Sequence, residues 1–163
     1  MKLNFGCGSI QPDGWVNLDA DREFNAQYRS TRELNDESFD VVVAHCALQI
    51  NTTADLPAVL ADIRRVLKPG GVLRVSLPNI ERGFQALDAG DIDWFPNRED
   101  DLEDRFSNWL TWYSTTRTLL TFGAALNLLR KHFHHAYLSE FGCGNGAELD
   151  TREGECYFVE AVK

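Results

Sequence analysis

Hydrophobic residues in the first half of the chain fall in short runs separated by polar turns. The run at residues 39–44 contains three consecutive valines, Val41 to Val43, without alternation. An unbroken β-branched run is typical of a central strand that is buried on both faces. Shorter apolar runs predict three further strands, at residues 2–5, 15–18 and 72–77.

Helical periodicity appears between the predicted strands at residues 39–44 and 72–77. Apolar residues recur at helical spacing over residues 55–67, Pro57 lies in the first turn where proline is tolerated, and basic residues cluster near the end. The pattern predicts an amphipathic helix that stops at Pro69-Gly70-Gly71. Strands that alternate with helices are typical of an α/β fold with a mostly parallel sheet.

The second half begins with a change in the sequence pattern over residues 82–113. Glycines and a proline interrupt it, and an acidic run at residues 99–104 is most simply a solvated face. We expect an inserted cap or lid, whose aromatic residues either bind an apolar or sugar substrate or pack on the core or in a homodimer surface. These aromatic residues are Trp94, Phe95, Trp109, Trp112 and Tyr113.

The remaining segments predict one helix and two strands. Apolar residues at helical spacing favour a helix over residues 116–132. Strands are expected at residues 136–141 and 156–162, and the Gly-rich, acidic loop between them favours antiparallel pairing. With no strong shift of composition along 163 residues, we expect a single domain, 1–163, with the cap as an insertion.

Composition narrows the class of protein. Twenty-five acidic against 16 basic residues give a net charge of −9, which disfavours nucleic acid and anionic membranes as partners. The sequence has no apolar run of the roughly 18 residues that a membrane span needs, and its four cysteines are scattered. We therefore expect a cytoplasmic protein with reduced thiols.

A glycine turn follows the first predicted strand. Gly6 and Gly8 flank Cys7 at the point where the chain must reverse and where a ligand can approach the backbone closely. Asp19, at the end of the second strand, is suited to accept hydrogen bonds from two adjacent ribose hydroxyls, and Asp21 is its nearby competitor. The alternatives are an ordinary Gly-rich turn and an aspartate that caps a turn or helix.

A histidine cluster raises the question of a metal. His132, His134 and His135 lie close to Cys143, and such side chains bind borderline metals. Adjacent residues in an extended chain point to opposite faces, however, and no second cluster completes a site. We expect surface histidines near a helix end and no metal.

Four motifs taken in order resemble those of class I S-adenosylmethionine-dependent methyltransferases. The resemblance implies a Rossmann-like fold with a final antiparallel strand at residues 157–161 and S-adenosylmethionine as cofactor. It covers about the first 80 residues, and the segment from about residue 82 to 113 matches no known motif. The motifs are residues 3–8 (LNFGCG), 17–19 (NLD), 36–43 (DESFDVVV) and 63–73 (IRRVLKPGGVL).

The resemblance also implies roles for individual residues. The glycine turn would contact the methionine end of the cofactor through its backbone, with Asn4 near the amino group, and Asp19 would hold the ribose. Leu34 and Asn35 would line the adenine site, and Ala44 and His45 would face the cofactor from the other side. The implied cofactor-binding residues are Asn4, Gly6, Cys7, Gly8, Asp19, Leu34, Asn35, Ala44 and His45.

Several positions depart from the family pattern. The nine residues from Gly6 to Gly14 fall short of the roughly 10–12 that a helical crossover needs, so the first helix should be missing or reduced to a turn. Ile10 stands in place of the third glycine of the loop, and residues 28–34 leave the only room for a third strand. Residues 48–50 read Leu-Gln-Ile where relatives commonly have Leu-Glu-His.

The function that these features imply is transfer of a methyl group from S-adenosylmethionine to a small-molecule or glycan-like acceptor. No obligatory catalytic side chain follows from the sequence, and His45 is the candidate general base because histidine titrates near neutral pH. A role for His45 in packing against the cofactor is equally consistent. The alternative function is a non-catalytic cofactor-binding or interaction module of the same fold. A nicotinamide-dinucleotide enzyme is disfavoured because the turn lacks GxGxxG.

Overall fold

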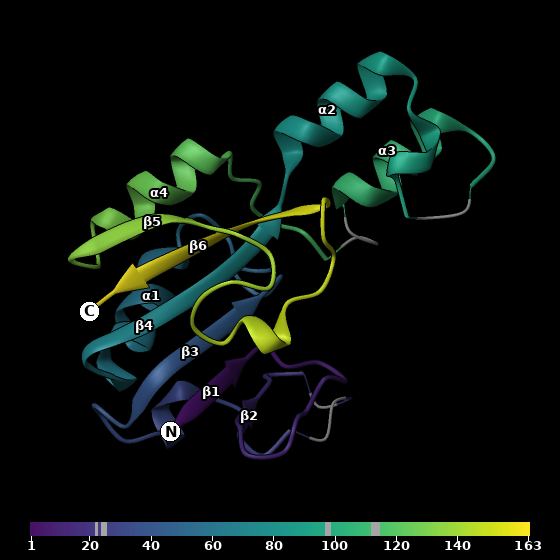
Figure 1. The fold of residues 1–163 in the computed structure, drawn as a ribbon. Helices are drawn as coiled ribbons and strands as arrows, with labels where there is room; N and C mark the ends of the chain where they lie inside the picture. The colour runs from purple at the N-terminus through teal and green to yellow at the C-terminus, as the bar shows by residue number, and fades with distance from the viewer. Residues whose placement is uncertain (22, 24–25, 97–98, 112–114) are drawn as a thin grey trace.

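A six-stranded sheet forms the centre of the protein (Figure 1). The structure is a computed structural model that describes residues 1–21, 23, 26–96, 99–111 and 115–163. The strand order is β2-β1-β3-β4-β6-β5. Strands β1 to β4 run parallel, and β6 pairs antiparallel with both β4 and β5. This confirms the predicted mostly parallel sheet with an antiparallel C-terminal strand. The strands are β1 (Lys2–Phe5), β2 (Val16–Leu18), β3 (Phe39–His45), β4 (Leu67–Pro78), β5 (His135–Ser139) and β6 (Cys156–Val162).

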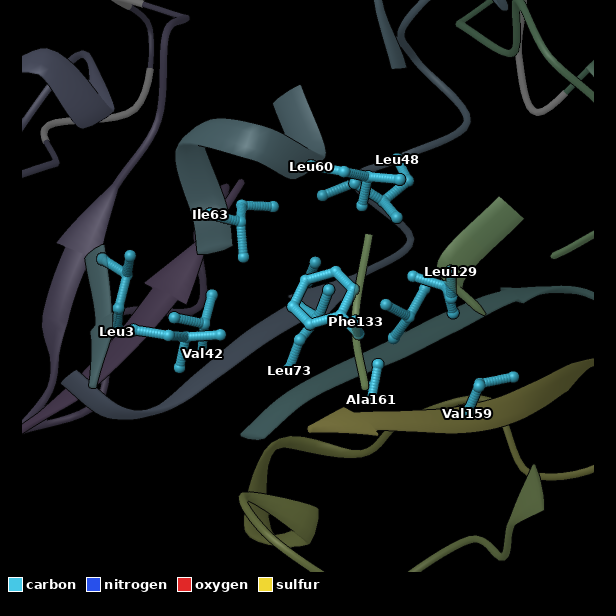
Figure 2. Close-up of a cluster of buried hydrophobic side chains, with 14 of the residues drawn as sticks. Leu3, Val42, Leu48, Leu60, Ile63, Leu73, Leu129, Phe133, Val159 and Ala161 are labelled. Atoms are coloured by element: carbon cyan, nitrogen blue, oxygen red, sulfur yellow. The ribbon is translucent and has the colours of Figure 1, made fainter. Parts of the chain in front are cut away.

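Helices α1 and α4 cover one face of this sheet. Leu60 and Ile63 of α1 meet the buried side chains of β1, β3 and β4, and Leu129 of α4 lies over β4 and β6 (Figure 2). None of the described helices is both long and apolar enough to cross a membrane. The helices are α1 (Leu56–Val66), α2 (Ile80–Ala89), α3 (Leu102–Thr111) and α4 (Phe122–Arg130), with short 3-10 turns η1 (Thr31–Glu33), η2 (Ile92–Trp94) and η3 (Ala147–Leu149).

The opposite face is covered by the loop between β5 and β6. Val42 belongs to the core on the α1 side, whereas Val41 and Val43 pack against Leu149 of η3 and against Trp15. In Figure 1 this loop and η3 lie across the sheet from α1. Strand β3 is therefore buried on both faces, as its valine run predicts. Residues 6–15, all of them described, contain no helix, so the loop covers the face from which the first helix is missing.

Several elements differ in extent from the sequence predictions. Strand β4 starts at Leu67 and runs through the Pro-Gly-Gly segment, because Leu67 pairs with Phe39 before an irregularity shifts the register. The expected strand at residues 136–141 ends at Ser139. In the room left for a third strand, the structure has one isolated parallel bridge between Tyr28 and Leu18.

The expected helix over residues 116–132 is shorter, since α4 begins at Phe122. The backbone N–H of Thr118 donates to the Gln49 carbonyl at 3.0 Å, and its hydroxyl donates to the Asn51 carbonyl at 2.6 Å. These bonds hold the segment before α4 against residues 49–51 and outside the helix. Thr121 then caps the helix by accepting from the Ala124 N–H at 3.2 Å.

Helices α2 and α3, together with η2, form a unit that projects past the carboxyl end of β4 (Figure 1). We call residues 80–96 and 99–111 the helical unit. Trp109 of α3 is 2% exposed, and its ring lies 5.0 Å from that of Trp94 and 5.9 Å from that of Phe95. A Cβ atom at Gly83 would come within 2.4 Å of the Trp109 ring, so glycine there permits the two helices to pack closely. Trp109 therefore packs inside the unit, while Trp112 and Tyr113 lie outside the described residues.

Candidate functional site

The glycine turn after β1 is tied to two neighbouring segments. Gly6 and Gly8 have φ angles of 69° and 53°, in the left-handed region that favours glycine. The Gly6 N–H donates to the Leu18 carbonyl of β2 at 2.8 Å. A Cβ atom at Gly6 would lie 2.5 Å from the Cβ of Ala47, which follows β3, so the turn packs closely against that segment.

Asp19 follows β2 and faces the same turn. Its Oδ2 accepts from the Gly8 N–H at 2.8 Å, and its Oδ1 accepts from the Asp21 N–H at 2.9 Å. The aspartate therefore orders the turn, which is the structural role weighed from the sequence. Because each carboxylate oxygen can accept more than one hydrogen bond, the same side chain retains capacity for a ligand hydroxyl.

Asn4 holds the short connection that replaces the first helix. Its Nδ2 donates to the Ile10 carbonyl at 2.8 Å and to the Asn17 Oδ1 at 3.1 Å. The side chain is buried, and it fixes the chain between β1 and β2. Both N–H groups of the Asn4 amide are used in these two bonds. Asn4 therefore contributes to a ligand site mainly by shaping the wall of the cavity.

His45 ends β3 and connects three segments of the chain. Its Nδ1 lies 2.5 Å from the Ser76 Oγ of β4, and its Nε2 lies 2.5 Å from the Thr151 Oγ1 of the β5–β6 loop. Both ring nitrogens therefore have hydroxyl partners. Any proton that His45 exchanges with a ligand passes through one of these hydroxyls or requires that a bond opens.

These residues converge on a cavity of about 350 Å³ at the carboxyl ends of β1, β2 and β3. The volume falls in the range of small-molecule sites. The structure brings together here Asn4, Gly6, Cys7, Gly8, Asp19 and His45 from the predicted set, joined by Ser9, Ile10, Cys46, Leu149 and Arg152.

The other three predicted residues lie elsewhere. Leu34 and Asn35 line a separate cavity of about 110 Å³ with Met1 and Phe39, which stand at the starts of β1 and β3. Leu34 and Asn35 precede β3 in the sequence and therefore lie at the opposite end of the sheet from the glycine turn. Ala44 is fully buried within the core on the α1 side.

A second cavity, of about 400 Å³, adjoins the first. Gly6 and Asp19 line both cavities. The second is lined by apolar side chains from the ends of β1 and β2 and by the segment that follows β3. Its lining residues are Phe5, Gly6, Leu18, Asp19, Ala20, Asp21, Ile50 and Asn51.

The β5–β6 loop supplies residues that the sequence analysis missed. Leu149 and Arg152 line the first cavity, and Thr151 contacts His45. Arg152 has a left-handed φ of 63° and forms an ion pair with Glu155, at 3.5 Å between Nη1 and Oε2. It brings a guanidinium to the cavity wall.

Buried charges hold this loop on the sheet. Arg74 of β4, 1% exposed, donates through Nε to the Asp150 Oδ1 at 2.8 Å and through Nη1 to the Glu160 Oε1 at 3.1 Å. Glu160 also accepts from the Asn145 N–H at 2.6 Å and from the Tyr137 hydroxyl at 2.8 Å. A charged residue within the apolar run of β4 is the sequence signal that could have revealed this network, because a buried arginine needs carboxylate partners.

The histidine cluster lies at the start of β5. His134 and His135 line a cavity beside β5 together with Arg130 and Tyr137. Within the part of the chain that the structure describes, no three histidine, cysteine, aspartate or glutamate side chains are grouped closely enough to hold a metal ion.

A family model described as a methyltransferase domain matches residues 20–130, more than half of the chain. The chain belongs to this methyltransferase family. The match begins directly after Asp19, so it does not include the glycine turn, for which the structure supplies the geometry. Methyl transfer is the activity of the family, and S-adenosylmethionine is the cofactor that the family implies.

Solved structures show that this methyltransferase shares the fold of S-adenosylmethionine-dependent relatives. A Thermotoga maritima enzyme matches with a TM-score of 0.64 and 18% identity, over 99% of this chain and 81% of its own. An Archaeoglobus fulgidus enzyme matches with a TM-score of 0.64 and 12% identity, over 99% of this chain and 85% of its own. A Mesorhizobium loti enzyme matches with a TM-score of 0.56 and 17% identity, over 99% of this chain and 90% of its own. No curated protein matches the sequence.

Proposed function

We propose that this methyltransferase binds S-adenosylmethionine across the two cavities that share Gly6 and Asp19 and methylates a small-molecule acceptor. The observation that carries the proposal is the convergence of the glycine turn, Asp19 and the end of β3 on one cavity. In open α/β sheets, ligands bind outside the carboxyl ends of the strands. The two cavities lie at that edge.

The residues present fit the parts of the cofactor. The second cavity has the apolar walls that an adenine ring needs, with Phe5, Leu18 and Ile50 among its lining. Asp19 lies between the cavities, where a carboxylate with spare acceptor capacity suits a ribose diol. Arg152 in the first cavity suits a carboxylate such as that of the methionine end.

The protein's task in the reaction is then mainly positioning. When bound, S-adenosylmethionine supplies a methyl group that its sulfonium already activates. The chain's residues hold the reactants in line, and such orientation contributes much of the rate in two-substrate reactions. His45 and Thr151 form the hydroxyl–imidazole pair at the cavity that can move a proton from an acceptor.

Calorimetric titration with S-adenosylmethionine and S-adenosylhomocysteine, set beside NAD, tests the cofactor. We expect saturable binding of the first two and none of NAD. Binding of NAD in preference would overturn the proposal. A turnover assay with tritiated S-adenosylmethionine and a panel of amines, phenols and sugars then tests methyl transfer. Cofactor binding without turnover on any of them would favour the non-catalytic module.

Asp19→Ala is expected to weaken S-adenosylhomocysteine binding by roughly ten- to a hundredfold, because a hydrogen bond to a charged group contributes about 1.5–3 kcal/mol. Asp19→Asn keeps the acceptor oxygen toward the turn and should lose less. Both affinities are measured by calorimetry, with thermal melts to confirm folding. If Asp21→Ala shows the larger loss, Asp21 is the ribose-binding acid.

Arg152→Gln is expected to weaken S-adenosylhomocysteine binding by about three- to tenfold, a modest effect because its side chain is partly exposed. Affinity for methylthioadenosine, which lacks the amino-acid carboxylate, should stay unchanged. The matched control is Glu155→Gln, which breaks the same ion pair but leaves the guanidinium in place. Equal losses for both ligands would show that Arg152 shapes the cavity and does not bind the carboxylate.

A further inference from the structure

Two cysteines meet beside the first cavity although they lie 110 positions apart in the sequence. Sγ of Cys46, which follows β3, is 3.6 Å from Sγ of Cys156, at the start of β6. Cys46 is half-buried and lines the cavity, whereas Cys156 is buried behind it. All four cysteines of the chain are free thiols.

The surroundings of the two sulfur atoms differ. Cys46 Sγ lies 3.9 Å from the His45 Nε2 and 3.8 Å from the Ser76 Oγ. Contact with the Cys156 thiol and with His45 lowers the pKa of Cys46. The same contact, together with burial, raises the pKa of Cys156. The pair therefore holds one thiol that ionises readily and one that keeps its proton, and the thiolate is the reactive form.

We propose that Cys46 and Cys156 form an oxidation site, in which Cys46 reacts with a hydroperoxide and Cys156 resolves the product to a disulfide. In the first step the Cys46 thiolate attacks one peroxide oxygen, the O–O bond breaks, and a sulfenic acid forms while the other oxygen leaves as water or an alcohol after taking up a proton. In the second step the Cys156 sulfur attacks the Cys46 sulfur. An S–S bond forms, and the sulfenic oxygen leaves as water with the proton of Cys156.

Closing the disulfide requires the sulfur atoms to approach from 3.6 Å to about 2.05 Å. Cys156 is held in the ladder opposite Pro78, so the movement falls mainly on Cys46. Cys46 already has a left-handed φ of 48°, and its N–H bonds to the Ser76 carbonyl at 3.2 Å. The segment that moves packs against Gly6 through Ala47, so oxidation shifts a wall of the first cavity. This last consequence rests on the proposed function, whereas the oxidation itself does not.

The other two cysteines serve as internal controls. Cys7 is buried beside Asp19, and burial raises the pKa of its thiol. Cys143 is exposed in the β5–β6 loop. Exposure alone would make Cys143 the first thiol to react, whereas the Cys46 surroundings favour Cys46 despite its partial burial.

Peptide mapping of the whole chain tests the site. After hydrogen peroxide treatment, a digest without reductant should contain the Cys46 peptide linked to the Cys156 peptide, and dithiothreitol should release both. Iodoacetamide at about pH 6 should label Cys46 before Cys143, because a thiol with a lowered pKa stays ionised in mild acid. Earlier labelling of Cys143, a linkage through Cys143, or oxidised Cys46 without a bond to Cys156 would overturn the proposal.

Single-cysteine variants separate the two steps. Cys156→Ser should stop at a sulfenic acid on Cys46 that a dimedone probe captures, and Cys46→Ser should give neither capture nor linkage. Cys143→Ser should form the linkage as fully as the unmodified chain. If Cys156→Ser misfolds, loss of the free Cys46 thiol in peroxide-treated intact protein still reports the first step.

Titration with S-adenosylhomocysteine of the reduced and disulfide forms tests the effect on the cavity. The disulfide form is expected to bind at least about threefold more weakly. A disulfide that forms in a protein with no affinity in either state would overturn the cofactor proposal and support the oxidation site. Equal binding by both forms would overturn the movement of the cavity wall.

Discussion

Arg74→Met is expected to lower the free energy of unfolding by about 3–5 kcal/mol, because it leaves the carboxylates of Asp150 and Glu160 buried without their cation. The substitution keeps an unbranched apolar stem and removes the guanidinium with its charge. Urea denaturation followed by circular dichroism measures the change. We expect the β5–β6 loop to detach from the sheet first, which hydrogen exchange over residues 140–155 would show.

The control for Arg74 is a cation on the surface. Lys68 forms an exposed ion pair with Asp40, at 2.7 Å between Nζ and Oδ1, so Lys68→Met should leave the free energy of unfolding nearly unchanged. The double variant Arg74→Met, Glu160→Gln should recover part of the loss, since it removes one of the stranded charges. Equal costs at Arg74 and Lys68 would show that the buried pairs do not hold the loop.

Trp109→Ala is expected to lower the free energy of unfolding by about 3–5 kcal/mol, the usual cost of truncating a large buried aromatic side chain. The ring lies among Trp94, Phe95 and Phe106 and against Gly83, so its loss leaves a cavity in the helical unit. Thermal melts and hydrogen exchange measure the effect. Because the unit has its own buried cluster, protection should fall in α2 and α3 before it falls in the sheet.

The matched control for Trp109 is Phe84, an aromatic residue of α2 that is 54% exposed. Phe84→Ala should change stability by less than about 1 kcal/mol. The sequence also left open an acceptor-binding role for Trp109. A Trp109→Ala protein that keeps its melting temperature but loses methyl transfer would support that role and contradict the packing observed.

The sequence predicted the elements whose signals are local. The valine run of β3 and the apolar spacing of α1 are both present in the structure, because burial dictates a pattern within each segment. The missing helix after β1 was also predictable, since nine residues cannot span the crossover. The helix expected from residue 116 was wrong at its start, because Thr118 bonds to carbonyls near residue 50 and no local pattern reveals such a partner.

The candidate site was predicted as far as it depends on chain order. Residues at the carboxyl ends of strands β1, β2 and β3 had to meet at one edge, and Gly6, Asp19 and His45 do so. Leu34 and Asn35 were placed by the resemblance alone, and here they lie at the other end of β3. Arg152 joins the site because Arg74 pairs with Asp150, 76 positions away, and single-sequence patterns do not encode such a pairing.

The β5–β6 loop has a consequence for the order in which the protein acquires its site. The glycine turn and Asp19 lie within the first 19 residues. Leu149 and Arg152, which line the same cavity, are synthesised much later. A ribosome-bound chain that has not yet extruded Glu160 lacks one of the two carboxylates that pair with Arg74, together with the strand β6 that ends the loop. Contacts of such long separation slow folding. Cofactor binding by stalled chains of increasing length should therefore switch on late, only once β6 has emerged.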